Sequence, residues 1–135
     1  MSEGPDMIIV DTSVVAKLFF PETGSESAKK LLLTNPLGAP DLLLYEFSNI
    51  LAYRTYLSLE DKKFFLKELH QLQLELFVLP QPGFDRVVEL CQEFHITAYD
   101  ASFVALAERL KLELITADLK LVRQVKRLSF VHALN

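Results

Sequence analysis

The chain has 135 residues, which fits one domain, and 50% of them are hydrophobic. No apolar stretch reaches the roughly 18 residues that a membrane-spanning helix needs, and the short acidic start is unlike a signal peptide. A net charge of -4 argues against a protein held on nucleic acid by a basic surface, and the single cysteine, Cys91, excludes an internal disulfide. We expect a disordered leader over residues 1–6, one domain over 7–135, no membrane contact and a reducing cytoplasm.

Strand-like and helix-like segments alternate along the chain. Short apolar runs predict strands over residues 7–10, 76–79, 112–116 and 130–132. Helices are predicted over residues 12–20, 25–33, 42–57, 58–73, 84–94, 97–110 and 119–126, and Pro21 ends the first of them. The Pro- and Gly-containing residues 35–40 indicate a loop that has room only for a very short strand. This alternation predicts a three-layer α/β/α sandwich with a mostly parallel central sheet.

Four acidic residues lie at or near the edges of apolar segments: Asp11, Glu46, Asp100 and Asp118. Asp11 directly follows the first predicted strand, and Asp118 lies two residues after the strand that ends at Thr116. Ligand sites of open parallel sheets form beyond the carboxyl ends of the strands, so these two side chains are expected at one edge of the sheet. Asp100 lies in the first turn of a predicted helix, and Glu46 lies inside another.

Three of these acids have a second interpretation. Asp11 and Asp118 could cap the helices that follow them, and Asp100 could complete a capping box. Each such cap contributes about 1 kcal/mol to stability. Glu46 lies inside a predicted helix, where capping cannot explain it. Its alternative role is that of an ordinary residue on a helix surface.

A cluster of carboxylates is costly unless a cation neutralises it. Two of them about 4 Å apart repel by around 4 kcal/mol at an effective dielectric constant of 20. If the fold brings the four acids together, their oxygen-only chemistry favours Mg²⁺ or Mn²⁺ over zinc. Such a site suits the hydrolysis of phosphodiester bonds by an activated water.

Four segments resemble, in order, the motifs of PIN-domain proteins. They are Ile9 to Glu22, Pro40 to Leu42 with Tyr45 to Leu51, Tyr99 to Ala107, and Leu114 to Leu121. The resemblance implies a metal-dependent ribonuclease that is most like the VapC toxins of prokaryotic type II toxin–antitoxin pairs. It also implies an RNA substrate, a small antitoxin protein as partner, and a homodimer.

The resemblance also implies which residues form the site. The catalytic and metal-binding residues would be Asp11, Glu46, Asp100 and Asp118, with Mg²⁺ or Mn²⁺ as the cofactor. The supporting polar residues would be Thr12, Ser13, Asn49 and Thr116, which orient carboxylates, waters or substrate. Asn49, one turn after Glu46, fits a solvent-facing residue equally well.

Two other functions stay open at this point. One is a PIN-like domain that binds or processes RNA outside a toxin–antitoxin pair, with or without turnover. The other, a receiver or phosphatase, is disfavoured because such domains carry an acid pair at the first strand end, where this chain has Asp11-Thr12-Ser13. The apolar face around Phe64 and Phe65 fits either the core or a groove for a second copy or an antitoxin.

Overall fold

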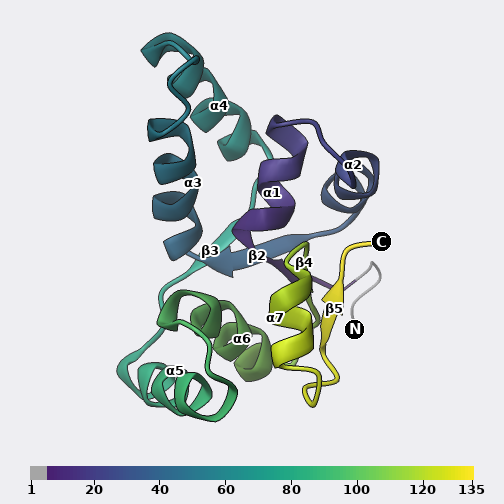
Figure 1. Ribbon diagram of the computed structural model, residues 1–135, viewed down its shortest axis with the longest axis vertical. Coiled ribbons are helices and arrows are strands. Elements are labelled where there is room, and N and C mark those ends of the chain that lie inside the picture. The colour runs from purple at the N-terminus through teal and green to yellow at the C-terminus, as the bar shows by residue number, and fades with distance from the viewer. Residues whose placement is uncertain (1–5) are drawn as a thin grey trace.

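A five-stranded parallel sheet lies between two layers of helices in the computed structural model, which describes residues 6–135 (Figure 1). Of the predicted leader, residues 1–5 lie outside the described residues, and Asp6 is exposed. The strands are β1 (Ile8–Val10), β2 (Leu37–Pro40), β3 (Glu75–Phe77), β4 (Leu114–Thr116) and β5 (Val131–Ala133). Their order in the sheet is β3-β2-β1-β4-β5, so all carboxyl ends lie at one edge. The predicted α/β/α sandwich is confirmed.

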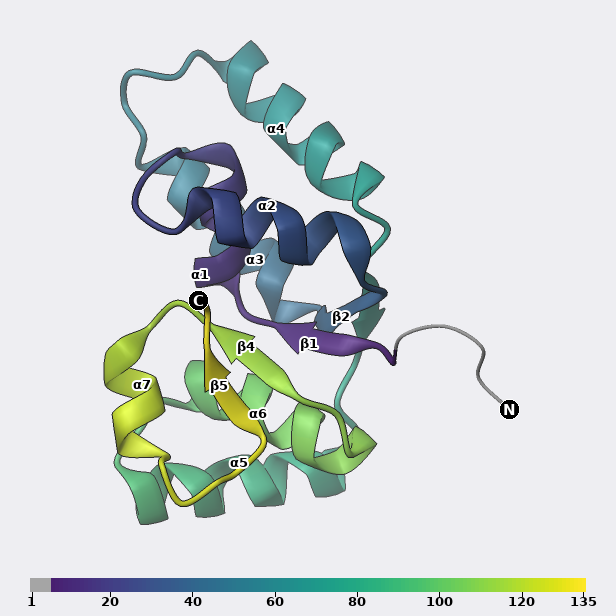
Figure 2. The same ribbon diagram turned by 90° about the vertical axis from the view of Figure 1, so that its right-hand side faces the viewer.

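The helices divide between the two faces of the sheet (Figure 2). One face carries α1 (Thr12–Phe19), α2 (Ser25–Thr34), α3 (Leu42–Ala52) and α4 (Leu59–Gln71). The other carries α5 (Gln81–Phe94), α6 (Ala98–Leu110) and α7 (Leu119–Gln124). Helix α6 packs on β1, β2 and β4 and is covered by α5, which explains why residues 101–107 are all buried. Among residues 6–135, no helix has the length and apolarity to cross a membrane.

Side-chain caps and aromatic packing account for much of the local structure. A capping box starts α4: Ser58 Oγ accepts from the Asp61 N–H at 3.0 Å, and the Asp61 carboxylate accepts from the Ser58 N–H at 3.2 Å. Phe47 is fully buried, and its ring centroid lies 5.1 Å from that of Phe19. Phe65 stands edge-on to Phe19 at 5.7 Å, which ties α4 to α1.

Residues 35–40 contain the very short strand for which the sequence left room: β2 covers four of them and is buried beside the central β1. Gly38 is required for close packing rather than for a turn. A Cβ on Gly38 would lie 2.6 Å from Met7 Sδ and 3.1 Å from Phe77 Cε2. Pro40 ends the strand, where a missing N–H donor is tolerated.

Several other element boundaries differ from the sequence prediction, each for a local reason. Helix α3 stops at Ala52 instead of running to residue 57, and a turn follows in which the Arg54 N–H bonds to the Leu51 carbonyl at 3.1 Å. Helix α5 starts at Gln81, three residues early, because a proline fits the first turn of a helix. Strand β4 starts at Leu114 because the Leu112 N–H bonds back to the last turn of α6. Strand β3 is Glu75–Phe77 rather than 76–79.

Candidate acidic site at the sheet edge

The chain order of the strands places an edge site between β1 and β4. The chain moves from β1 outward through β2 to β3, and then crosses to β4 on the other side of β1. Ligands of open parallel sheets bind at such a reversal point. Val10 pairs with Ile115, and the Asp11 N–H bonds to the Ile115 carbonyl at 3.4 Å. Asp11 and Asp118 therefore follow neighbouring strands at the same edge, as the strand prediction expects.

Asp11 is buried, with 7% of its surface exposed, and several donors hold its carboxylate. The Ser13 hydroxyl donates to Oδ1, the Thr116 hydroxyl donates to Oδ2, and the backbone N–H groups of Ser13 and Val14 donate to Oδ1 at 3.1 and 3.4 Å. Burial raises the pKa of Asp11 to about 6 in spite of these bonds, and the negative charge of Asp100 adds to the shift. The structure thus places Ser13 and Thr116 in contact with Asp11.

The same two hydroxyls also fix the chain that follows β4. Ser13 Oγ accepts from the Ala117 N–H at 2.9 Å, and Thr116 Oγ1 accepts from the Asp118 N–H at 3.0 Å. Each hydroxyl therefore donates to Asp11 and accepts from the backbone beside Asp118. The positions of Asp11 and Asp118 depend on one another through these four bonds.

Glu46 and Asp100 come to the edge from helices rather than from strand ends. Glu46 is half-buried on α3, and Thr12 Oγ1 donates to its Oε1 at 2.6 Å. Asp100 is half-buried in the first turn of α6, and its pKa is raised by burial and then by the negative charges of Asp118 and Glu46. Burial is the main cause of both shifts, and Asp100 is the member whose charge acts on Asp11 and is acted on by Asp118 and Glu46.

The donor set fits a hard divalent cation, although the side chains do not surround one point. Within residues 6–135, no three His, Cys, Asp or Glu side chains are grouped closely enough to hold a metal ion. Carboxylate oxygens are the ligands that Mg²⁺ and Mn²⁺ prefer, and a cation would offset the burial and the repulsion that raise the pKa values of Asp11 and Asp100. Glu46 and Asp100 are only half-buried and Asp118 is exposed, so these three side chains have room to turn.

The alternative reading as helix caps is correct for two of the acids. Asp11 is the N-cap of α1, and Asp118 is the N-cap of α7, where its Oδ1 accepts from the Lys120 and Leu121 N–H groups at 3.0 and 3.2 Å. Capping by Asp118 uses one oxygen and leaves the other for a ligand. Asp100 makes only half of a capping box. Its N–H donates to Thr97 Oγ1 at 3.1 Å, but among the described residues its carboxylate receives no return bond from the Thr97 N–H.

Two other polar residues lie apart from the carboxylates. Asn49 is exposed, and the part of the chain that the structure describes contains no hydrogen bond between it and Glu46. Lys17 donates to the Glu22 carboxylate at 3.2 Å and to the Thr23 carbonyl at 2.6 Å, away from the four acids of the edge. The sequence reasoning missed a hollow beside the site, between α3, α5 and α6. Two of its three aromatic residues, Tyr45 and Tyr99, directly precede Glu46 and Asp100, and that adjacency was the available signal.

The fold and the site together define a class: an α/β protein with an oxygen-only acidic edge suited to a divalent cation. A model of the PIN domain matches residues 8–127, which include all four acids, and the chain belongs to the PIN domain family. It is 32% identical over 125 residues to "Ribonuclease VapC3" of Pyrobaculum aerophilum, covering 87% of this chain and 93% of the relative. It is 34% identical over 119 residues to "Ribonuclease VapC9" of Mycobacterium tuberculosis, covering 85% and 88%.

A solved structure shows the same fold. The "Toxin-antitoxin complex from Klebsiella pneumoniae" aligns with a TM-score of 0.71 over 92% of this chain and 94% of that chain. The sequence identity is 21%, so this likeness supports the arrangement of strands and helices and nothing beyond it.

Proposed function

We propose that the protein is a divalent-metal-dependent endoribonuclease, one nuclease domain over residues 7–135, that acts as the toxin of a type II toxin–antitoxin pair. The observation that carries this proposal is that Asp100 lies near enough to Asp11, Glu46 and Asp118, at the sheet edge of a PIN-domain chain, for their charges to interact. The relatives VapC3 and VapC9, which are named as ribonucleases, support the substrate class. The oxygen-only ligands support Mg²⁺ or Mn²⁺.

The chain's own residues have distinct parts in this chemistry. When bound, a divalent cation polarises a phosphoryl oxygen and lowers the pKa of a bound water. Ser13 and Thr116 hold the Asp11 carboxylate rigidly, and Thr12 holds Glu46. Burial, and then the charges of Asp118 and Glu46, raise the pKa of Asp100, so a cation bound beside it would favour its ionised form.

The test is RNA cleavage by the purified protein in Mg²⁺, in Mn²⁺ and in chelator. We expect cleavage with either metal and none in chelator. Asp100→Asn should lower kcat/KM by more than about 100-fold, because even partners of metal ligands typically cost 10- to 100-fold. The matched control is Glu93→Gln, which neutralises an exposed carboxylate on α5 and should cleave like the parent.

Two outcomes would redirect the proposal. If Asp100→Asn cleaves as fast as the parent, the proposed site is wrong. If the parent binds RNA in all metals and never cleaves it, the protein is an RNA-binding PIN domain without turnover.

An antitoxin partner is part of the same proposal. A groove of about 520 Å³ between α1, α2 and α4 is lined by Phe19, Leu33, Phe64, Phe65 and Leu72, among others. Phe64 and Leu33 are more than half exposed, which supports a groove that takes the apolar face of a partner helix. Growth arrest on expression, relieved by co-expression of a small protein encoded beside this one, would support this role; Phe64→Glu should abolish the relief.

The proposal also includes a homodimer in a reducing cytoplasm. Val78 and Val88 are exposed apolar residues after β3 and on α5, and they support self-association. Light scattering of the purified protein should give twice the mass of the chain, and a monomer at micromolar concentration would remove this part.

A further inference from the structure

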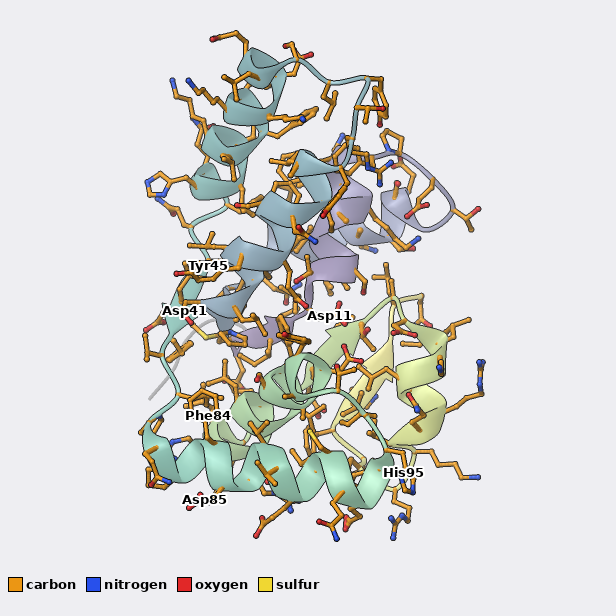
Figure 3. The ribbon with its side chains drawn as sticks, turned by 60° about the vertical axis from the view of Figure 1, so that its left-hand side comes forward. Asp11, Asp41, Tyr45, Phe84, Asp85 and His95 are labelled. Carbon is orange, nitrogen blue, oxygen red and sulfur yellow. The ribbon has the colours of Figure 1, made fainter. Side chains whose placement is uncertain are left out.

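A hollow of about 250 Å³ opens beside the acidic edge, between the starts of α3, α5 and α6. Tyr45, Phe84 and Tyr99 line it and are exposed by 73%, 51% and 62%. Asp41 and Ser102 are its polar lining residues. Figure 3 shows Asp41, Tyr45 and Phe84 along one side of the view, with Asp11 toward the centre. Three exposed aromatic rings gathered around one carboxylate are typical of a binding site.

This pocket is continuous with the acidic site through the chain itself. Tyr45 directly precedes Glu46 on α3, and Tyr99 directly precedes Asp100 on α6. Neighbouring positions on a helix point about 100° apart, so each helix presents an acid and an aromatic ring on adjoining faces. An RNA chain whose phosphate lies at Glu46 and Asp100 would therefore place its neighbouring base at the pocket.

The charge of the pocket argues for a base rather than a phosphate. Asp41 is its one charged lining residue. Asp41 occupies the N-cap position of α3, yet its backbone is helical and its side chain makes no capping hydrogen bond, unlike Asp11 and Asp118. Its carboxylate is thus available as an acceptor. A phosphate would be repelled there, whereas a neutral planar ring with N–H donors on its edge matches both the aromatic walls and the acid.

We propose that this pocket binds the nucleobase next to the scissile phosphate, stacked on Tyr45 and Tyr99, and that Asp41 selects guanine. Guanine presents two adjacent N–H donors on its pairing edge, and a carboxylate accepts both at once. Aromatic stacking is sequence-tolerant, so Tyr45 and Tyr99 supply affinity while Asp41 supplies the choice of base. This inference rests on the proposed ribonuclease function and adds its base preference.

Cleavage of a randomised RNA gives the first test. For the parent we expect guanine to be enriched at one position beside the cleaved bond. Asp41→Asn should lower that preference by about tenfold, since a bidentate pair typically discriminates by roughly that factor or more. Tyr99→Ala should lower kcat/KM by about tenfold, and Tyr99→Phe should restore it because the ring returns.

The matched control is Tyr53→Ala. Tyr53 is 78% exposed at the end of the same helix as Tyr45 and does not line the pocket, so its loss should leave the profile unchanged. If Asp41→Asn and Tyr99→Ala both keep the parent's base profile and rate, the pocket assignment is overturned while the ribonuclease function stands. If Tyr99→Ala instead changes only the mass measured by light scattering, the surface joins two copies of the chain and the inference fails.

A second measurement does not depend on cleavage. Guanosine 5′-monophosphate, added to nitrogen-15-labelled Asp100→Asn protein, should shift the backbone amide resonances of residues 41–45, 84 and 98–102 in magnetic resonance spectra. Uridine 5′-monophosphate should shift them less, and equal shifts would overturn the guanine selectivity. If the parent cleaves no RNA but guanosine still shifts these amides, the pocket stands and the proposed function fails.

Discussion

The two halves of the acidic edge are built differently. Asp11 and Asp118 follow β1 and β4, and each caps a helix with its carboxylate. Glu46 and Asp100 lie on α3 and α6, and neither carboxylate completes a cap. The first pair is held by bonds on which local structure depends, whereas the second pair contributes mainly charge. In the proposed site Asp11 and Asp118 would therefore serve both as helix caps and as metal ligands, whereas Glu46 and Asp100 cap no helix with their carboxylates.

The largest expected effect is a pH-dependent stability that arises from the burial of Asp11. Its pKa in the folded protein, about 6, lies above its ordinary value of 3.8, so the folded state binds this proton more tightly than the unfolded state. The resulting stabilisation is fully present below about pH 4 and is lost as the pH rises through 6. Urea unfolding in chelator should therefore show that Asp11 contributes roughly 2 kcal/mol less stability at pH 7.5 than at pH 4, given 1.36 kcal/mol for each pKa unit. Asp100, whose pKa is also raised, acts in the same direction.

Two comparisons sharpen this prediction. Asp11→Asn removes the titrating group while preserving the side chain's size, so its unfolding free energy should vary less between pH 4 and 7.5. Mg²⁺ or Mn²⁺ at pH 7.5 should raise the unfolding midpoint of the parent, because a ligand of the folded state stabilises it. A parent whose stability is flat over this pH range would show that the buried carboxylate carries no such cost.

The sequence predicted the first half of the edge better than the second. Apolar runs ending at Val10 and Thr116 were enough to put Asp11 and Asp118 at one edge, because parallel strands end together. The bond from Thr12 to Glu46 spans 34 residues and depends on how α3 packs on α1, which no local pattern encodes.

The sequence left room for strand β2 without favouring it over a loop, and it did not indicate the pocket, for related reasons. Gly38 and Pro40 carry local turn signals, and the close approach of Met7 and Phe77 that requires a glycine exists only in the folded sheet. The exposure of Tyr45 and Tyr99 is likewise a tertiary property. The resemblance to PIN-domain motifs supplied Glu46 and Asp100, which spacing alone did not bring to the edge.

A smaller effect is expected from Thr12, which links the two halves. Thr12→Val keeps the volume of a buried side chain but removes the donor to Glu46 Oε1. The metal concentration for half-maximal cleavage should rise about 10- to 100-fold, as is typical when a partner of a metal ligand is lost. The control is Thr34→Val, which removes an exposed bond to the Lys30 carbonyl at the end of α2. An unchanged metal requirement would mean that Glu46 needs no orientation or binds no metal.

The smallest effect separates the halves most directly. In metal-free protein, Asp118→Ala should cost about 1 kcal/mol, because α7 loses the cap that satisfies the Lys120 and Leu121 N–H groups. Asp100→Ala should cost less or stabilise the protein, since it removes a charge whose pKa is raised by burial and by its neighbours. Both should lose cleavage to a similar degree. Asp118→Ser should restore the thermal midpoint, because serine caps a helix as well as aspartate does, while cleavage stays lost. Equal thermal midpoints for the two alanine variants would mean that the division of the edge into a structural and a chemical half is mistaken.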